Sequence, residues 1–362
     1  MTQPPLPYAP EIETPEEDEQ TVINGIIEGM TAQSQTVASR EHHAARASHA
    51  KSTALATGYL DILPDLSPEL AQGLFVKPGR YTVAVRFAQG TGETLGDRVS
   101  THRGLSVKIF GVEGEKLDGH VDGTQDFVLA SGPTFPSGTA KGFLRDGSVI
   151  GKAAGLPEGA KSAVSTAART FNEILHRFGT ESPMADFFGH PFSHPLSEPY
   201  FSQAPLRYGA HVAKIAAFPV MHDIEQLREW RLDPAAGENG FRHATGTYFA
   251  EHEVRYEIRV QLWNNQDKQP IEDASVEWSV EDAPFQTVAV LILPAQNTYS
   301  PARVQYFNEK MTFRPAHSLA VHRPLGSVMR ARLQVYAALS RFRHRHNDVP
   351  EANPESINEI PA

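Results

Sequence analysis

The chain has 362 residues, of which 40% are hydrophobic and 21% are charged, so it is long enough to enclose a cofactor within one core. Its 33 Lys and Arg residues and 43 Asp and Glu residues give a net charge of −10, which argues against a general nucleic-acid-binding protein because phosphates require a surplus of positive charge. The absence of cysteine excludes disulfides, thiolate-bound metals, iron–sulfur clusters and cysteine nucleophiles.

The two ends of the chain are expected to be disordered. Residues 1–20 are acidic and rich in Pro, and residues 348–362 have a similar composition with few core-forming side chains. The start has neither the basic nor the apolar region of a secretory signal, and no apolar run approaches the length of a membrane-spanning helix. We therefore expect one domain over residues 21–347, in a cytoplasmic protein without an integral membrane segment.

Strand patterns dominate the middle of the chain. The segment YTVAVRFA (81–88) alternates, with Val83, Val85 and Phe87 on one side. Further strands are predicted over 104–111, 126–130, 208–218, 254–263 and 285–293. Helices are predicted over 161–179 and from Leu325 to about Arg345. This order indicates an α+β fold in which an antiparallel β-barrel is surrounded by helices.

The segment RLQVYAALSRFR (332–343) carries the first candidate chemistry. On a helix Arg332 and Tyr336 are four residues apart and lie on one face. A guanidinium beside a phenol stabilises the phenolate, which is a suitable ligand for ferric haem iron. Arg343 lies two turns further along the same face, where it could hold a carboxylate. The alternative is an amphipathic helix with Tyr336 in a core and the arginines in solvent.

Two earlier segments add polar groups. In RASHAKS (46–52), His49 is a suitable base for moving a proton between the two oxygens of a peroxide. In AVRFAQGTGE (84–93), Arg86 stands within an apolar strand. Taken alone, His49 is more often a surface residue, and Arg86 is more often on the solvent face of its strand.

In order, these segments resemble the haem catalase family from about residue 40 to residue 345. SHAKS is similar to the segment with the distal histidine, and AVRF with the following GxGE is similar to a strand that carries a propionate-binding arginine. HRGLSVKIF (102–110), TFPS (134–137), MTFRP (311–315) and the proximal-helix pattern R-x-x-x-Y-x-x-x-x-R-x-R (332–343) follow in the family's order.

The resemblance implies bound haem b, with Tyr336 as the axial ligand of the iron on a proximal helix near the C-terminus. It implies that His49 transfers the peroxide proton and that Arg332 keeps the ligand ionised. It further implies contacts to the haem propionates and ring from Arg46, Arg86, Arg343 and Phe135.

The chain also departs from the family. Ser48 precedes His49 where an apolar residue is usual, and in HVDGTQDF (120–127) Gly123 stands at the place of the distal asparagine, with Asp122 beside it. Only 26 residues follow Tyr336, so the long C-terminal helical part of typical catalases is missing. The resemblance is therefore to the small, catalase-related members.

We expect a haem-dependent peroxidase that reduces hydrogen peroxide or organic hydroperoxides with a small organic electron donor, through a ferryl intermediate. Peroxidase chemistry is favoured over catalase chemistry because Gly123 offers no side-chain donor and the Ser48 hydroxyl could engage the His49 ring. A true catalase, an enzyme that rearranges or dehydrates fatty-acid hydroperoxides, and a non-catalytic haem-binding protein remain alternatives, as does a lipocalin-like carrier of another ligand. A homo-oligomer is compatible with the chain; a nucleic-acid partner is not expected.

Overall fold

A closed ring of antiparallel strands forms the centre of the molecule in the computed structural model, which describes residues 3–154, 156–176, 182–233, 235 and 237–362. The strands are β1 (Ser52–Ile62), β2 (Gly79–Gln89), β3 (Arg103–Phe110), β4 (Thr124–Ala130), β5 (Tyr200–Phe201), β6 (Leu206–Tyr208), β7 (His211–Pro219), β8 (Val254–Leu262) and β9 (Gln286–Leu293). Their order is β5-β4-β3-β2-β1-β9-β8-β7-β6, and a further pairing of β5 with β7 closes eight of them into a barrel. The predicted α+β barrel is confirmed.

The barrel interior is the main hydrophobic core. Val83, Val85 and Phe87 of β2 all point into it and are fully buried, as their alternation predicts. Arg86 lies between two of them in the strand and therefore points out of the barrel. It is nevertheless buried, at 3% exposure, because other elements cover this outer face. The alternative interpretation, in which Arg86 lies on the solvent face of its strand, is thus wrong.

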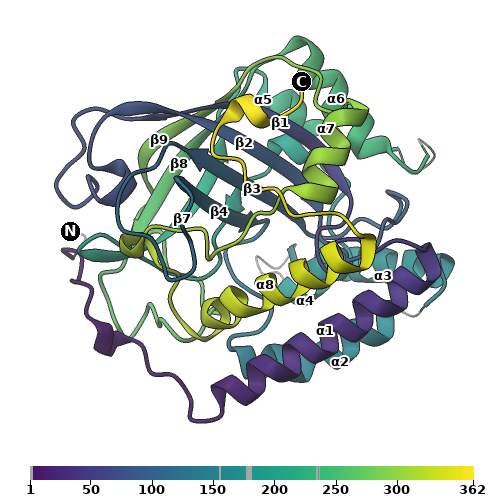
Figure 1. The fold of residues 1–362 in the computed structure, drawn as a ribbon, viewed down its shortest axis with the longest axis horizontal. Helices are drawn as coiled ribbons and strands as arrows, with labels where there is room; N and C mark the ends of the chain where they lie inside the picture. The colour runs from purple at the N-terminus through teal and green to yellow at the C-terminus, as the bar shows by residue number, and fades with distance from the viewer. Residues whose placement is uncertain (1–2, 155, 177–181, 234, 236) are drawn as a thin grey trace.

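Helices cover the outer face of β2–β4. The helices are α1 (Glu19–Glu41), α2 (Ala140–Ala154), α3 (Glu158–His176), α4 (Pro183–Phe188), α5 (Ile224–Glu229), α6 (Gly240–Glu251), α7 (Pro301–Gln305) and α8 (Ser327–Asn347). Figure 1 shows α8 next to the barrel, with α1 and α2 side by side beyond it. Ile23 and Ile26 of α1 pack with Ala331 and Val335 of α8, which fixes the distance between these helices.

Most predicted elements are present within about three residues of their expected ends. The strand predicted over 208–218 is instead a hairpin of β6 and β7, because Gly209 turns the chain with a φ of +63°. The helix predicted over 161–179 is α3, and residues 177–179 lie outside the described residues. Strands β1 and β5 and the helices α1, α2, α4, α5, α6 and α7 were not predicted.

The two ends of the chain differ from the expectation of disorder. Leu6 donates a backbone hydrogen bond to Trp263, and Leu6, Tyr8 and Ile12 pack on a small core cluster. At the other end, Ile357 and Ile360 pack against a cluster outside the barrel. A few apolar anchors in an otherwise polar sequence are therefore enough to attach both ends to the domain.

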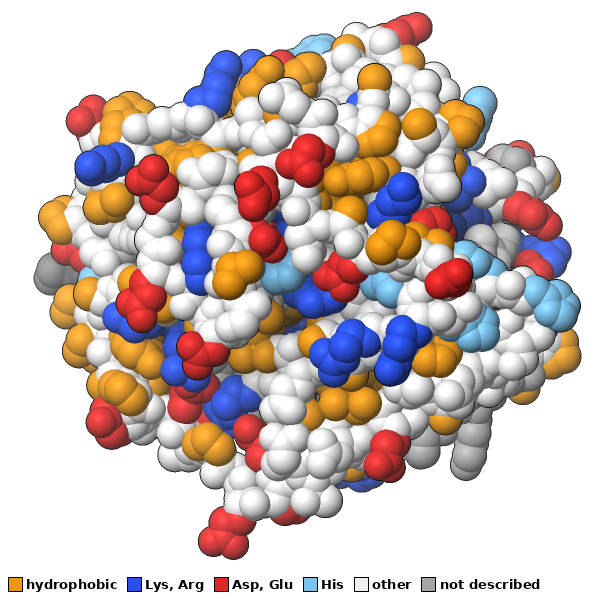
Figure 2. Space-filling model, in the orientation of Figure 1, with side chains coloured by type: hydrophobic (Ala, Val, Ile, Leu, Met, Phe, Trp, Pro, Cys, Tyr) orange, Lys and Arg blue, Asp and Glu red, His pale blue; other side chains and the backbone are white. Residues whose placement is uncertain are grey.

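The surface carries charges of both signs. Figure 2 shows acidic and basic side chains interspersed over one face, with no large area of a single sign. Among the described residues, no helix is both long and apolar enough to cross a bilayer.

Candidate active site

A cavity of about 600 Å³ lies between the outer face of β2–β4 and the helices α1, α2, α3, α4 and α8. Its size is within the range of pockets that hold small molecules and cofactors. Most of its lining is apolar, with Ile26, Phe143, Val164, Phe187 and Val335 among the side chains that face it. Polar and charged side chains also line it, and all of the predicted site residues except Gly123 are among the lining residues.

Tyr336 and Arg332 face the cavity from α8. The Arg332 Nη2 atom donates a hydrogen bond of 3.0 Å to the Tyr336 hydroxyl oxygen, as the four-residue spacing predicts. Arg332 also reaches the Val128 carbonyl of β4, at 3.5 Å, so the helix is tied to the barrel at this point. The phenol oxygen is therefore oriented by a cation and retains a lone pair for a metal ion.

Three arginines, the buried Arg86 and Arg343 and the half-buried Arg46, line one part of the cavity and converge on Asn308. Arg46 and Arg343 donate to the Asn308 carbonyl oxygen, at 2.8 and 2.7 Å, and Arg86 donates to the Asn308 side-chain oxygen at 3.3 Å. Their other partners are backbone carbonyl groups and the ring of His344. Among the described residues, none of the three forms an ion pair with a carboxylate.

The electrostatics of this arginine cluster are unfavourable without an anion. Burial, and next the charges of Arg86 and Arg343, lower the pKa of Arg46 well below its usual range. Burial likewise lowers the pKa of Arg86 to about 9. Glu309 offsets part of this effect at Arg46 and Arg343, but none of the three arginines has an ion-paired carboxylate among the described residues, which indicates a binding place for carboxylate groups of a ligand.

His49 faces the same cavity from the barrel side. It lies in the loop between α1 and β1, with a left-handed φ of +55°, and its ring lies against Gly104 of β3. Burial lowers the pKa of His49 well below its usual range, and the neighbouring His102 and Arg86 lower it further. The imidazole is therefore neutral at physiological pH and able to accept a proton.

Ser48 and Phe135 also line the cavity. The Ser48 hydroxyl donates to the Gly90 carbonyl oxygen at 3.2 Å, so the expected engagement of the His49 ring by this hydroxyl is not present. Phe135 packs on Phe143 of α2, with ring centroids 5.6 Å apart, and it contacts the cluster formed by the start of α8.

Solved structures of catalases have a similar architecture. A fungal catalase superposes with a TM-score of 0.59 at 15% sequence identity, covering 89% of this chain and 66% of that one. A bacterial catalase gives 0.59 at 19% identity, covering 89% and 62%, and catalase A from Saccharomyces cerevisiae gives 0.56 at 15% identity, covering 89% and 69%. The chain has the catalase fold.

The chain spans about two thirds of the length of these catalases. No protein-family model and no curated protein matches its sequence. At identities below 20% the likeness establishes the catalase fold alone, so the activity has to be argued from the cavity.

Gly123 lies outside the cavity of this catalase fold, and its prediction as a site residue is wrong. It directly precedes β4, where Thr124 pairs with Phe110, whereas the His49 ring lies at Gly104, six residues back along β3. At about 3.3 Å per residue, this places Gly123 roughly 20 Å from the histidine. Asp122, one residue further from β4 than Gly123, also lies outside the cavity lining.

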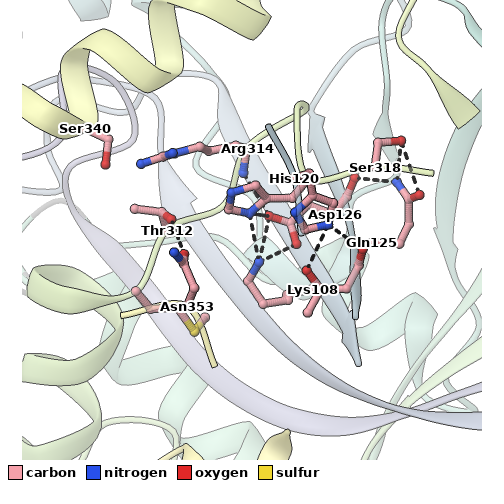
Figure 3. Close-up of polar contacts among 12 residues, drawn as sticks. Lys108, His120, Gln125, Asp126, Thr312, Arg314, Ser318, Ser340 and Asn353 are labelled. Carbon is pink, nitrogen blue, oxygen red and sulfur yellow. Dashed lines mark hydrogen bonds and ion pairs between the residues drawn. The ribbon is translucent and has the colours of Figure 1, made fainter. Parts of the chain in front are cut away.

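Near Gly123, a buried polar network is formed around Lys108 of β3 and Asp126 of β4. Lys108 donates to Asp126 at 2.7 Å, and the side chain of His317 and the backbone of Arg314 also hydrogen-bond to Asp126 (Figure 3). The segment that carries Thr312 and Arg314 thereby closes one end of the cavity.

Among the residues that were not predicted from the sequence, two bear on the site: His102, which lines the cavity, and Asn308, which binds the three arginines without lining the cavity itself. His102 faces the cavity beside His49, with ring centroids 5.2 Å apart. Asn308 collects the three arginines from a π-helical turn (Tyr306–Lys310), a rare geometry that often marks functional sites. His102 directly precedes the Arg103–Gly104 pair noted in the sequence, whereas nothing in the sequence singles out Asn308.

Proposed function

We propose that the protein is a haem b-dependent peroxidase that reduces hydrogen peroxide or organic hydroperoxides with a small organic electron donor. One observation carries the proposal: the buried Arg86 and Arg343 and the half-buried Arg46, none of them ion-paired with a carboxylate among the described residues, face the same cavity as the Arg332–Tyr336 pair and a neutral histidine. Haem is a planar apolar ring with two carboxylates at one edge and a metal at its centre, and this donor set matches each of those parts.

The residues present fit haem in detail. Arg46, Arg86 and Arg343 would hold the propionates, which would supply the negative charge that the cluster lacks. The Tyr336 oxygen would bind the iron, with Arg332 stabilising its ionised form. Phe135 and the apolar side chains of α1 and α8 would cover the ring and exclude water.

When bound, haem supplies a redox-active iron at which a peroxide oxygen can bind. The chain's own contribution to the reaction is proton transfer. The neutral His49 ring accepts the proton of the peroxide hydroxyl and returns it to the departing oxygen, which leaves as water or an alcohol. Each proton taken up is given back, so the ring ends the step neutral.

Peroxidase chemistry is favoured over hydrogen peroxide dismutation by the cavity walls. The part of the cavity along α1, α2 and α4 is lined by Met30, Leu144, Phe187 and Phe188, which suit an organic molecule better than a second hydrogen peroxide. The same walls would admit a fatty-acid hydroperoxide for rearrangement. We retain as part of the proposal that the protein acts in the cytoplasm, alone or as a homo-oligomer.

The deciding experiment begins with the absorption spectrum of the protein reconstituted with haem b. A five-coordinate ferric tyrosinate spectrum is expected, and a histidine-ligated spectrum would contradict the ligand assignment. Steady-state turnover of hydrogen peroxide is then measured with and without a phenolic reductant. Fast oxygen evolution that needs no reductant would instead identify a true catalase.

A further inference from the structure

The cavity contains a second histidine that the proposed function does not use. His102, in the residue before β3, faces the cavity, and its ring stands edge-on to the ring of His49, with an interplanar angle of 75°. It stacks on Phe187 of α4 with ring centroids 4.3 Å apart. The two imidazoles therefore lie side by side on the barrel side of the cavity.

Each of the two rings lies against a glycine. A Cβ at Gly90 would stand 2.1 Å from the His102 ring, and a Cβ at Gly104 would stand 2.7 Å from the His49 ring. Any larger residue at either position would displace a ring. The backbone at Gly90 and Gly104 thus leaves space for two histidines, one in the segment before β1 and one directly before β3.

The His102 ring packs on Phe187, but the Nδ1 atom of neither histidine is used by the described part of the fold. The Nδ1 atoms of both are buried and make no hydrogen bond among the described residues. This leaves Nε2 of each ring as the nitrogen available to a ligand in the cavity. Burial lowers the pKa of His102 to about 4, so this ring, like His49, is neutral at physiological pH and carries one N–H and one lone pair.

Two neutral imidazoles match the two oxygens of a hydroperoxide. The ring that presents a lone pair accepts the O–H proton, and the ring that presents an N–H donates to the other oxygen. We propose that His102 is the second ligand-contacting residue on the barrel side, donating a hydrogen bond to one peroxide oxygen while His49 accepts the proton of the other; this rests on the proposed function. His102 would thereby supply the polar group that Gly123 does not.

The test compares His102→Phe, which keeps a stacked ring but has no donor, with His102→Gln, which places an amide N–H near the position of Nε2. In the haem-loaded protein, His102→Phe is expected to slow the reaction with hydrogen peroxide roughly ten- to a hundredfold, the scale of one hydrogen bond to a developing charge. His102→Gln is expected to restore most of that rate.

Fluoride binding to the ferric protein, followed by absorption, provides a readout besides turnover. Fluoride accepts hydrogen bonds, so its affinity is expected to fall roughly tenfold in His102→Phe and to recover in His102→Gln. If Phe is not accommodated, His102→Met removes the donor with a more adaptable side chain. His120→Phe is the matched control, because His120 is also buried and stacked on another ring but lies outside the cavity.

The outcomes separate the two proposals. A wild-type protein that binds no haem contradicts the proposed function. A wild-type protein that binds haem and reacts with peroxide, beside a His102→Phe variant with unchanged rate and fluoride affinity, overturns the role of His102 alone. If both His102→Phe and His102→Gln lose peroxide reactivity and fluoride affinity, the role of His102 is also overturned, because that pattern indicates a structural role for the ring.

Discussion

The imidazole of His49 lies directly against the Cα of Gly104: a Cβ at residue 104 would stand 2.7 Å from both Nδ1 and Cε1 of the ring. Gly104→Ala should therefore displace the ring and slow the peroxide reaction at least tenfold, since a small misplacement of a catalytic group is costly. The pre-steady-state rate checks this. Gly246→Ala, in α6 with nothing within 4 Å of the added Cβ, should leave the rate unchanged.

Tyr336→Phe removes the only atom by which this residue could bind iron. Haem should be lost or its spectrum changed, because the hydrogen bond from Arg332 then also has no acceptor. Haem content and the absorption spectrum are the measurements. Tyr306→Phe, outside the cavity lining, serves as the control, and an identical spectrum in both variants would rule out Tyr336 as the ligand.

His49→Ala should slow the reaction with hydrogen peroxide by roughly a hundredfold or more, the usual contribution of a positioned acid–base group. Haem content should barely change, because the proposed iron ligand comes from α8. Stopped-flow absorption measures the rate. His43→Ala removes a half-exposed histidine near the same loop and should have no effect; equal rates in both variants would exclude His49 from proton transfer.

Arg86→Met should weaken haem binding roughly ten- to a hundredfold, the scale of a hydrogen bond to a charged group. The haem-free protein provides a second, pH-dependent check. Since burial lowers the pKa of Arg86 from its usual value to about 9, its charge destabilises the fold at neutral pH, and that penalty is relieved as the pH rises through about 9.

Chemical unfolding at several pH values measures this penalty. The free energy of unfolding of wild type relative to Arg86→Met should rise in favour of wild type as the pH increases above about 9. A difference that is constant with pH would contradict the lowered pKa of Arg86 in the folded state. Arg80→Met, which removes an exposed partner of Asp61, should change neither haem affinity nor this pH dependence.

The sequence predicts those strands and helices in which apolar residues recur with the period of the element. Strand β2 is evident because Val83, Val85 and Phe87 alternate with outward residues, and α8 is evident from its helical spacing. Strand β1 was missed because both of its faces are covered, so that Ala54, Leu55 and Ala56 are all fully buried and no alternation appears. Helix α1 was missed because small and polar residues interrupt its apolar positions.

The candidate site was predictable where side chains of fixed spacing share one element. Arg332 and Tyr336 are one turn apart on α8, so their contact follows from the helix itself. The Gly123 assignment failed because it depended on aligning a loop, and the position of β4 relative to His49 is set by strand register. The contribution of Asn308 depends on a tertiary contact that brings one loop to three arginines distant in the sequence.

Arg330, near the start of α8, donates hydrogen bonds to three carboxylates: Glu13, Glu19 and Glu272. Two of these belong to the first twenty residues, so the chain start acts as a clamp on the helix that carries Tyr336. Proteolytic trimming or deletion of those residues would leave one carboxylate of three. Measurements at the cavity therefore require a protein that retains Glu13 and Glu19. Weak haem binding by a protein that lacks these residues would reflect the loss of their contacts with α8, and would not test Tyr336 as the iron ligand.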